Sequence, residues 1–306
     1  MFDGISEKLE TPEIFNPKSV AVVTATYCPD WYPGEPRQPL AADKLRGNLA
    51  IQSAQAAKKQ GFQIIFIDGS GNESFRKELE KLGVNYQSER EPLTQGSARR
   101  QGLEIVQSLG GVKIICETEP EKASMIADCL KFASQPIATG EADIVVPKRT
   151  EESFSTLPSY QAKAEKRANQ MYNQLLRAHG LLKPEDPDID FWFGVRVFAN
   201  RPEIVKLFEK RYEFSPSGLA LHKIIRSDAY SNPLEFPVVN ALHDGLRVKS
   251  VEIPYVHSWE QTEFEEGKEE FNRKRDVQRR AIVTELLHFI RYLEENQKTR
   301  ISEKQL

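Results

Sequence analysis

Cysteine is scarce in this sequence. The 306 residues include only Cys28, Cys116 and Cys129, and no two of them stand in a CxxC pattern. An odd number without that spacing excludes a disulfide framework and a cysteine zinc site, and it favours a reducing compartment. The sequence also lacks an apolar run long enough to span a bilayer and the apolar segment of a secretory signal near its start. We therefore expect a cytoplasmic protein with no integral membrane segment.

An excess of charge of one sign is missing as well. The chain carries 42 basic and 45 acidic residues, a net charge of −3, and no basic tract interleaved with aromatic residues. This balance supplies no field that would attract nucleic acid, so no nucleic-acid partner is expected. The length suits one enlarged domain or two modest ones. The sequence leaves the oligomeric state open, a homo-oligomer included.

Three apolar, β-branched runs that end abruptly in polar residues are the most informative feature that is present. They are VAVVTATY at 20–27, IIFIDGSGNES at 64–74 and KIICETEP at 113–120. Buried parallel strands have this composition, and the polar residues after them line the crevice at the carboxyl edge of a sheet. Helices are expected between and after these strands, at 42–60, 74–82, 97–109 and 120–134. This alternation predicts an α/β fold with helices on both faces of the sheet.

The second half of the chain is less regular. Helices are expected at about 160–179, 202–212, 218–227 and 237–244, followed by a strand at 247–256. The charged tail from Glu265 onwards predicts one long solvent-facing helix. Its apolar stripe comprises Ile282, Leu286, Leu287, Ile290 and Leu293. Pro120 is expected in the first turn of its helix, where proline is tolerated.

Several segments, taken in order, resemble the GT-A-type nucleotide-sugar-dependent glycosyltransferases, nearest their family 2. These segments are FIDGSGNES (66–74), GSARRQGL (96–103), ICETEP (115–120), VVPKR (145–149), DFWFGVRVFANRPEI (190–204) and LEFPVVNALHDGLRVKSVEIPYVH (234–257). The resemblance covers roughly 18–260 and lies in the colinear order of the segments. It implies a three-layer α/β/α domain with a mostly parallel central sheet and a C-terminal helical extension.

The resemblance also divides the chain. It implies a glycosyltransferase domain over 1–264, with a nucleotide-binding half at 18–150 and an acceptor half at 151–264, and a C-terminal helix and tail at 265–306.

The donor side is expected at the ends of the first two strands. The resemblance places Thr24, Thr26 and Tyr27 against the nucleotide, Asp68 against its ribose or base, and Arg99 towards the nucleobase or diphosphate. A planar, permanently charged guanidinium suits phosphate. Each residue also has a plain structural interpretation. The threonines and the tyrosine can be ordinary strand-end groups, Asp68 can begin a turn, and Arg99 can cap a solvated helix face.

Glu117 and Glu119 form the candidate metal site. Residues i and i+2 of an extended chain point to the same face, so both carboxylates could hold one divalent cation. ICETEP stands where the family carries its metal motif, usually with aspartates, and some relatives add a histidine at the position of His257. The implied cofactor is Mn²⁺ or Mg²⁺. The alternatives are an acid pair that precedes a helix and a histidine at the surface or in the core.

Glu235 and Asp190 compete as the catalytic acid of the acceptor side. A carboxylate there would remove the proton from the acceptor hydroxyl. Glu235 could instead be a helix N-terminal acid, and Asp190 could bind the sugar or the acceptor. Trp192 and Phe193 could stack on a sugar ring or belong to the core.

The sequence therefore predicts a glycosyltransferase that moves a sugar from a nucleotide-diphosphate sugar to a hydroxyl acceptor. The alternative is a non-catalytic relative that binds a nucleotide sugar, or a partner, without transfer. A dinucleotide-dependent oxidoreductase is disfavoured, because DGSGNES supplies only Gly69 and Gly71 of the required G-x-G-x-x-G. Donor, acceptor and stereochemical outcome are not encoded in any feature of the sequence.

Overall fold

The computed structural model describes residues 15–90, 94–213, 228 and 231–303, with side chains to residue 296. The strands are β1 (Val20–Thr26), β2 (Gln63–Asp68), β3 (Asn85–Ser88), β4 (Ile114–Glu117), β5 (Ile144–Arg149), β6 (Arg196–Ala199) and β7 (Val248–Ile253). They form one seven-stranded sheet in the order β3-β2-β1-β4-β6-β5-β7. Only β6, among these strands, runs opposite to its neighbours, so the sheet is mostly parallel.

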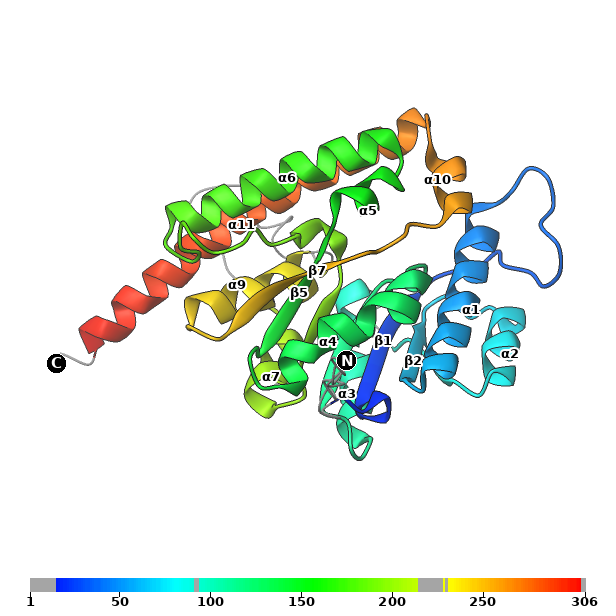
Figure 1. The fold of residues 1–306 in the computed structure, drawn as a ribbon, viewed down its shortest axis with the longest axis horizontal. Coiled ribbons are helices and arrows are strands. Elements are labelled where there is room, and N and C mark those ends of the chain that lie inside the picture. The colour runs from blue at the N-terminus through cyan, green and yellow to red at the C-terminus, as the bar shows by residue number, and fades with distance from the viewer. Residues whose placement is uncertain (1–14, 91–93, 214–227, 229–230, 304–306) are drawn as a thin grey trace, which may run out of the picture.

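Helices cover both faces of this sheet (Figure 1). The α-helices of the described chain are α1 (Ala42–Gln60), α2 (Glu73–Lys81), α3 (Gln95–Ser108), α4 (Leu130–Ala138), α5 (Glu151–Ser155), α6 (Ser159–Ala178), α7 (Pro202–Glu209), α9 (Phe236–His243), α10 (Trp259–Glu265) and α11 (Glu269–Glu303). Shorter turns are η1 (Pro17–Ser19), the π-helical η2 (Met125–Cys129), η3 (Phe191–Phe193) and the π-helical η4 (Ser231–Glu235).

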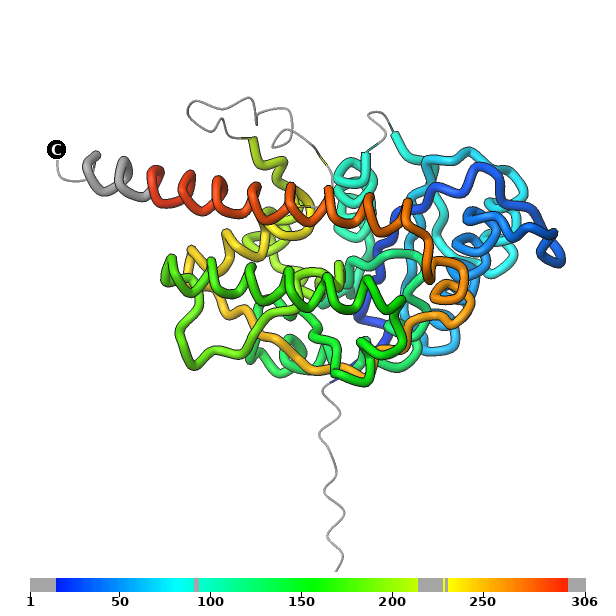
Figure 2. Tube along the Cα trace, turned by 90° about the horizontal axis from the view of Figure 1, so that it is seen from above, coloured from blue at the N-terminus to red at the C-terminus, as the bar shows by residue number. Residues whose placement is uncertain are grey.

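Two hydrophobic clusters separate the layers. Alternate residues of β1 point to opposite faces, so Val22 packs towards α1, α2 and α4, whereas Val23 packs towards α3, α7 and α9. The cluster that contains Val23 extends beyond the sheet, because α6 adds Tyr172 to it and α11 adds Leu286 and Phe289. Figures 1 and 2 show these two long helices side by side. The predicted three-layer domain with a helical extension is thus what the chain forms.

Local signals in the sequence explain where the elements begin and end. Asn72 caps α2, its side chain accepting from the backbone N–H of Phe75. Gly61 ends α1 with φ = 79°, a left-handed conformation that favours glycine. These boundaries lie within a few residues of the predicted ones. Among the described helices, none is both long and apolar enough to cross a membrane.

Two expectations were wrong, and a third lies outside the described residues. Pro120 stands in a turn before the helix rather than in its first turn, because helical structure starts only at Ala123. The charged tail does form one long helix, α11, but this helix is not solvent-facing along its length, because Leu286 and Ile290 of its apolar stripe are buried in the main core. The predicted helix at 218–227 falls in the part of the chain that the structure does not describe.

Candidate active site

A cavity of about 260 Å³ lies at the carboxyl edge of the sheet. Residues from the segments after β4 and β7 and before β6 line it together with η4, α6, α10 and α11. Its lining includes Glu119, Lys122, Gln161, Glu165, Trp192, Gly194, Glu235, Tyr255, His257, Gln261, Glu265, Arg275 and Arg279. This cavity therefore brings together four residues that the sequence analysis named as candidates for the site. They are Glu119, Trp192, Glu235 and His257, the first and last of which are 138 positions apart in the sequence.

Glu119 stands two residues beyond β4 and pairs with Lys122. Burial opposes the charge of Glu119, but the Lys122 and Arg99 cations and the hydrogen bonds to the carboxylate together outweigh it, so the pKa of this carboxyl lies below its ordinary value. Gly194 makes room for the carboxylate: a Cβ at this glycine would lie 2.4 Å from Glu119 Oε1. Gly194 also has φ = 73°, which favours glycine, and any larger residue here would displace the Glu119 carboxylate.

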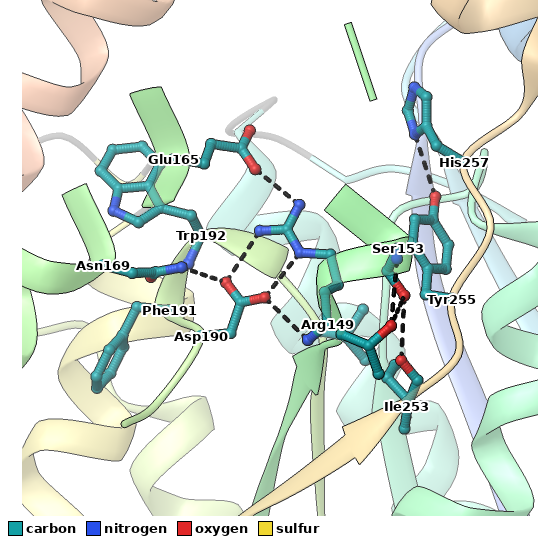
Figure 3. Close-up of polar contacts among 12 residues, drawn as sticks. Arg149, Ser153, Glu165, Asn169, Asp190, Phe191, Trp192, Ile253, Tyr255 and His257 are labelled. Atoms are coloured by element: carbon teal, nitrogen blue, oxygen red, sulfur yellow. Dashed lines mark hydrogen bonds and ion pairs between the residues drawn. The ribbon is translucent and has the colours of Figure 1, made fainter. Parts of the chain in front are cut away.

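His257 lies close to this carboxylate in a mostly buried position. Its Nδ1 is 3.3 Å from the Tyr255 hydroxyl (Figure 3), and its backbone N–H donates to Thr156 Oγ1. Its Nε2 has no hydrogen-bond partner among the described residues. Burial, and then the cations Lys122 and Arg275, lower the pKa of His257 to about 3. The imidazole is therefore neutral near pH 7, the form that binds a metal ion.

Glu117 is separated from this cavity, although it is only two residues from Glu119. It is buried, and Arg99 Nη1 lies 3.5 Å from its Oε2. Glu117 Oε1 and Arg99 Nε lack partners within the described part of the chain. Burial raises the pKa of Glu117 to about 7 against the opposing effect of Arg99. Arg99 thus contacts the candidate metal motif, and Glu117 does not line the cavity that holds Glu119 and His257.

Glu235 does line the cavity and is held by a buried arginine. Arg196 Nη2 donates to Glu235 Oε2 at 2.6 Å, and its other donors bind the backbone oxygens of Phe191, Leu234 and Val195. Burial raises the pKa of Glu235 to about 7, with Arg196 opposing that shift. A carboxyl group with a pKa near 7 suits proton transfer at neutral pH.

Asp190, the other candidate acid, forms part of a buried network (Figure 3). Arg149 donates to both of its oxygens, at 2.7 Å from Nε and 2.9 Å from Nη2, and Asn169 Nδ2 donates at 2.6 Å. Burial acts to raise the pKa of Asp190, but the Arg149 charge and the hydrogen bonds from Arg149 and Asn169 together outweigh it, so the pKa lies below its ordinary value. Asp190 is not among the cavity-lining residues, and these contacts suit it to hold Arg149 in place.

Asp68 and Thr26 meet at the neighbouring end of the sheet. Thr26 Oγ1 donates to Asp68 Oδ1 at 2.8 Å, and Ser70 Oγ and the Tyr86 hydroxyl donate to Oδ2. Tyr27 is 67% exposed beside them. Thr24 is buried in β1, and its Oγ1 has no partner in the described structure.

The two aromatic candidates have different surroundings. Trp192 lines the cavity and is only partly buried, and its Nε1 lacks a partner among the residues described. Phe193 packs edge-on against Tyr255 in the core, with the Arg149 guanidinium 5.1 Å from its ring centroid. Trp192 alone of this pair faces a space that a ligand could enter.

Sequence reasoning missed the polar residues that α6, α10 and α11 add to the cavity. The missed set is Gln161, Glu165, Gln261, Glu265, Arg275 and Arg279. One signal was available, because a glutamine precedes a glutamate by four positions in both QAKAE and QTEFE. That spacing places the two side chains on one face of a helix.

No protein-family model matches the chain, and no curated protein is similar to it in sequence. Solved structures are similar in fold. Three are of glucosyl-3-phosphoglycerate synthase from Mycobacterium tuberculosis, and the match to each covers 89% of this chain and 80% of that one. The complex with phosphoglyceric acid has a TM-score of 0.54 at 12% identity. The complex with Mn²⁺, UDP-glucose and phosphoglyceric acid has a TM-score of 0.53 at 12% identity. The complex with Mn²⁺, UDP-glucose and glycerol 3-phosphate has a TM-score of 0.52 at 11% identity.

The strand order and these similarities define a GT-A-like fold. The prediction of a GT-A-like three-layer domain is therefore confirmed. At 11–12% identity the similarity establishes the fold and leaves the chemistry to be argued from the residues of this chain.

Proposed function

We propose that this protein transfers a sugar from a nucleotide-diphosphate sugar to a hydroxyl group of an acceptor. One observation carries the proposal: Glu119, Glu235 and His257 line a single cavity at the carboxyl edge of a GT-A-like sheet. Ligands of open α/β sheets bind at that edge. Two of the three similar structures were solved with Mn²⁺ and UDP-glucose, which supports a nucleotide-sugar donor and a divalent ion here as well.

The residues present fit a divalent ion. Glu119 offers a carboxylate oxygen, and His257 offers an imidazole nitrogen that is neutral at pH 7 and unpaired within the described structure. This oxygen and nitrogen set suits Mn²⁺, and Mg²⁺ commonly takes its remaining ligands from substrate phosphates. No cluster of three or more protein metal ligands exists in the described part of the chain. We therefore assign Glu119 and His257 as the protein's ligands, and the bound ion would neutralise charge on the departing diphosphate.

Thr26, Tyr27 and Asp68 are proposed to bind the donor's nucleoside. The hydrogen bonds between Thr26 and Asp68 support this role, because they hold the carboxylate in one orientation at the strand ends. The exposed Tyr27 ring beside it offers a flat surface for a base. Thr24 and Arg99 are buried, so we propose that they support this side from beneath.

Glu235 is proposed to accept the proton of the acceptor hydroxyl. The acceptor oxygen then forms a bond to the anomeric carbon, while the bond from that carbon to the diphosphate oxygen breaks and the diphosphate keeps its electron pair. Arg196 fixes Glu235, and the pKa of Glu235 near 7 supports this exchange at neutral pH. Asp190 and Arg149 are proposed to position the neighbouring η3 segment.

The test is a panel of nucleotide-diphosphate sugars, assayed with and without Mn²⁺ by thermal shift and by release of nucleoside diphosphate. We expect one donor to stabilise the protein and to turn over only with the metal ion. Glu119→Ala should weaken Mn²⁺ binding at least about 100-fold, because a charged ligand is lost. Glu203→Ala, at an exposed position of α7, is the matched control.

The variant Glu235→Gln separates binding from chemistry. It should abolish transfer and leave donor affinity nearly unchanged, since the amide keeps the shape of the carboxylate but accepts no proton. Equal losses of both would refute the role as base. Donor binding without turnover under any condition would identify a non-catalytic sugar-nucleotide binder. Absence of binding by every donor would refute the proposed function.

A further inference from the structure

Two glutamine–glutamate pairs stand on the helical side of the cavity. Gln161 Nε2 donates to Glu165 Oε1 at 2.8 Å on α6, and Gln261 Nε2 donates to Glu265 Oε1 at 3.1 Å on α10. A carboxylate only accepts hydrogen bonds, so each amide must turn its NH₂ group to its glutamate. The carbonyl oxygen of each glutamine is thereby fixed as a free acceptor.

Arg275 of α11 joins the two pairs. Its Nη2 lies 2.6 Å from Glu265 Oε2 and its Nη1 lies 3.5 Å from Glu165 Oε1. Arg149 binds the other oxygen of Glu165 at 2.7 Å. Glu165 is thus held by two guanidinium groups and Glu265 by one, so both carboxylates in this polar wall of the cavity are paired.

Besides His257 Nε2, four polar atoms of the lining residues have no hydrogen-bond partner among the residues that the structure describes. They are Gln161 Oε1, Gln261 Oε1, Trp192 Nε1 and Arg279 Nη1. The residues Gln161, Gln261 and Arg279 are each more than nine-tenths buried. An unpaired buried polar atom is costly, so several around one cavity require an explanation. Two of these atoms are acceptors and two are donors.

We propose that this wall binds the acceptor, and that the acceptor is a neutral polyhydroxylated molecule such as a sugar or a sugar alcohol. The inference rests on the proposed function. A hydroxyl group both donates and accepts, so adjacent hydroxyls can satisfy glutamine oxygens and N–H donors together. A phosphate or carboxylate only accepts, and would leave both glutamine oxygens unpaired. The volume of about 260 Å³ suits a small molecule.

The position of the wall favours the acceptor over the nucleotide. Asp68 and Thr26 are the last residues of β2 and β1, whereas α6 and α10 follow β5 and β7 at the other end of the sheet. Glu119, after β4, lies between these two regions in the strand order. A donor held at Asp68 and Glu119 therefore leaves the glutamine wall to the second substrate.

The first experiment compares matched neutral and phosphorylated polyols on the full-length wild-type protein. With Mn²⁺ and the donor found in the panel, glycerol is paired with glycerol 3-phosphate, and glucose with glucose 6-phosphate. We expect a neutral member to accelerate release of nucleoside diphosphate and its phosphorylated partner to give no advantage. Preference for the phosphorylated members would overturn the inference and point to Lys274, an exposed cation of the lining.

The second experiment removes the two amides. Gln161→Met and Gln261→Met should each raise KM for the neutral polyol about 3- to 10-fold, and the double variant should raise it further. The Kd of UDP, measured by calorimetry, should change less than about twofold, since the wall does not hold the nucleotide. Gln101→Met is the matched control. Gln101 is buried in α3 outside the cavity, and both the oxygen and the nitrogen of its side-chain amide are hydrogen-bonded.

Trp192→Phe keeps the partly exposed ring and deletes the N–H donor, so it tests the wall if the methionine variants fold poorly. It should raise KM for the polyol about 3-fold. Unchanged KM in all three variants would overturn the inference while leaving sugar transfer intact. The inference would also be overturned if the wild-type protein bound and hydrolysed a donor but transferred its sugar to no neutral polyol. Failure to bind any donor would instead refute the proposed function.

Discussion

The donor end and the metal end of the candidate site differ in how completely the chain satisfies its own polar groups. At the donor end, both oxygens of Asp68 accept hydrogen bonds from Thr26, Ser70 and Tyr86. At the metal end, His257 Nε2 has no partner within the described structure. The Asp68 carboxylate is fully engaged by the chain itself, whereas the His257 imidazole keeps one nitrogen for the proposed metal ion. Loss of the Asp68 carboxylate should therefore lower stability most, and loss of the His257 imidazole should chiefly weaken Mn²⁺ binding.

The largest expected effect on stability belongs to the donor end. Asp68→Ala should lower the free energy of unfolding by about 3 kcal/mol, because the Thr26, Ser70, Tyr86 and Gly71 donors lose their common acceptor. Urea unfolding measures it, with Asp128→Ala at an exposed position as the control. A loss below about 1 kcal/mol would remove the distinction between the two ends.

A smaller effect concerns pH at the metal end. The pKa of His257 is lowered from 6.5 to about 3 in the folded protein. Between pH 6.5 and pH 3, His257 is therefore protonated in the unfolded chain and neutral in the folded protein. The free energy of unfolding falls as pH falls through this range. At pH 5 in EDTA, the wild type should be about 2 kcal/mol less stable relative to His257→Gln than at pH 7.5. Parallel stability curves for the two proteins would show that His257 is not shielded from protonation.

The smallest effect tests the space beside Glu119. Gly194→Ala should cost about 1–2 kcal/mol of stability and weaken Mn²⁺ binding, because the new Cβ would lie 2.4 Å from Glu119 Oε1. Gly140 has the same φ of 73° with no atom within 4 Å, so Gly140→Ala carries the backbone strain alone. Equal Mn²⁺ affinities in the two variants would mean that Glu119 does not need this space.

The arrangement of strands and helices could be predicted because it depends on local patterns. Apolar β-branched runs marked β1, β2 and β4, and glycines marked several helix ends. The long tail was placed incorrectly because an apolar stripe on a charged helix does not reveal its partner. Leu286 and Phe289 are buried in one cluster with residues of α6 and α9, which are distant in the sequence.

The candidate site was predictable where colinear motifs marked it, and not where side chains meet across the fold. Glu119, Glu235 and His257, which the resemblance singled out, line one cavity, and their roles stay predictions. The i, i+2 rule put Glu117 beside Glu119 but could not foresee that α3 would bring Arg99 against it. Likewise, the bridge that Arg275 makes between α6 and α10 depends on tertiary contacts that no local spacing contains.

The reversed direction of β6 has a consequence for how the site is assembled. Its antiparallel register pairs Glu117 with Arg196, and two steps beyond the strand ends the same register sets Glu119 opposite Gly194. A slip of one residue would present Val195 to Glu119 and exchange the faces of every β6 side chain. The hydrogen-bond ladder of the sheet thus brings the acid and the glycine together, so the backbone pairing of β6 helps to shape the proposed metal site.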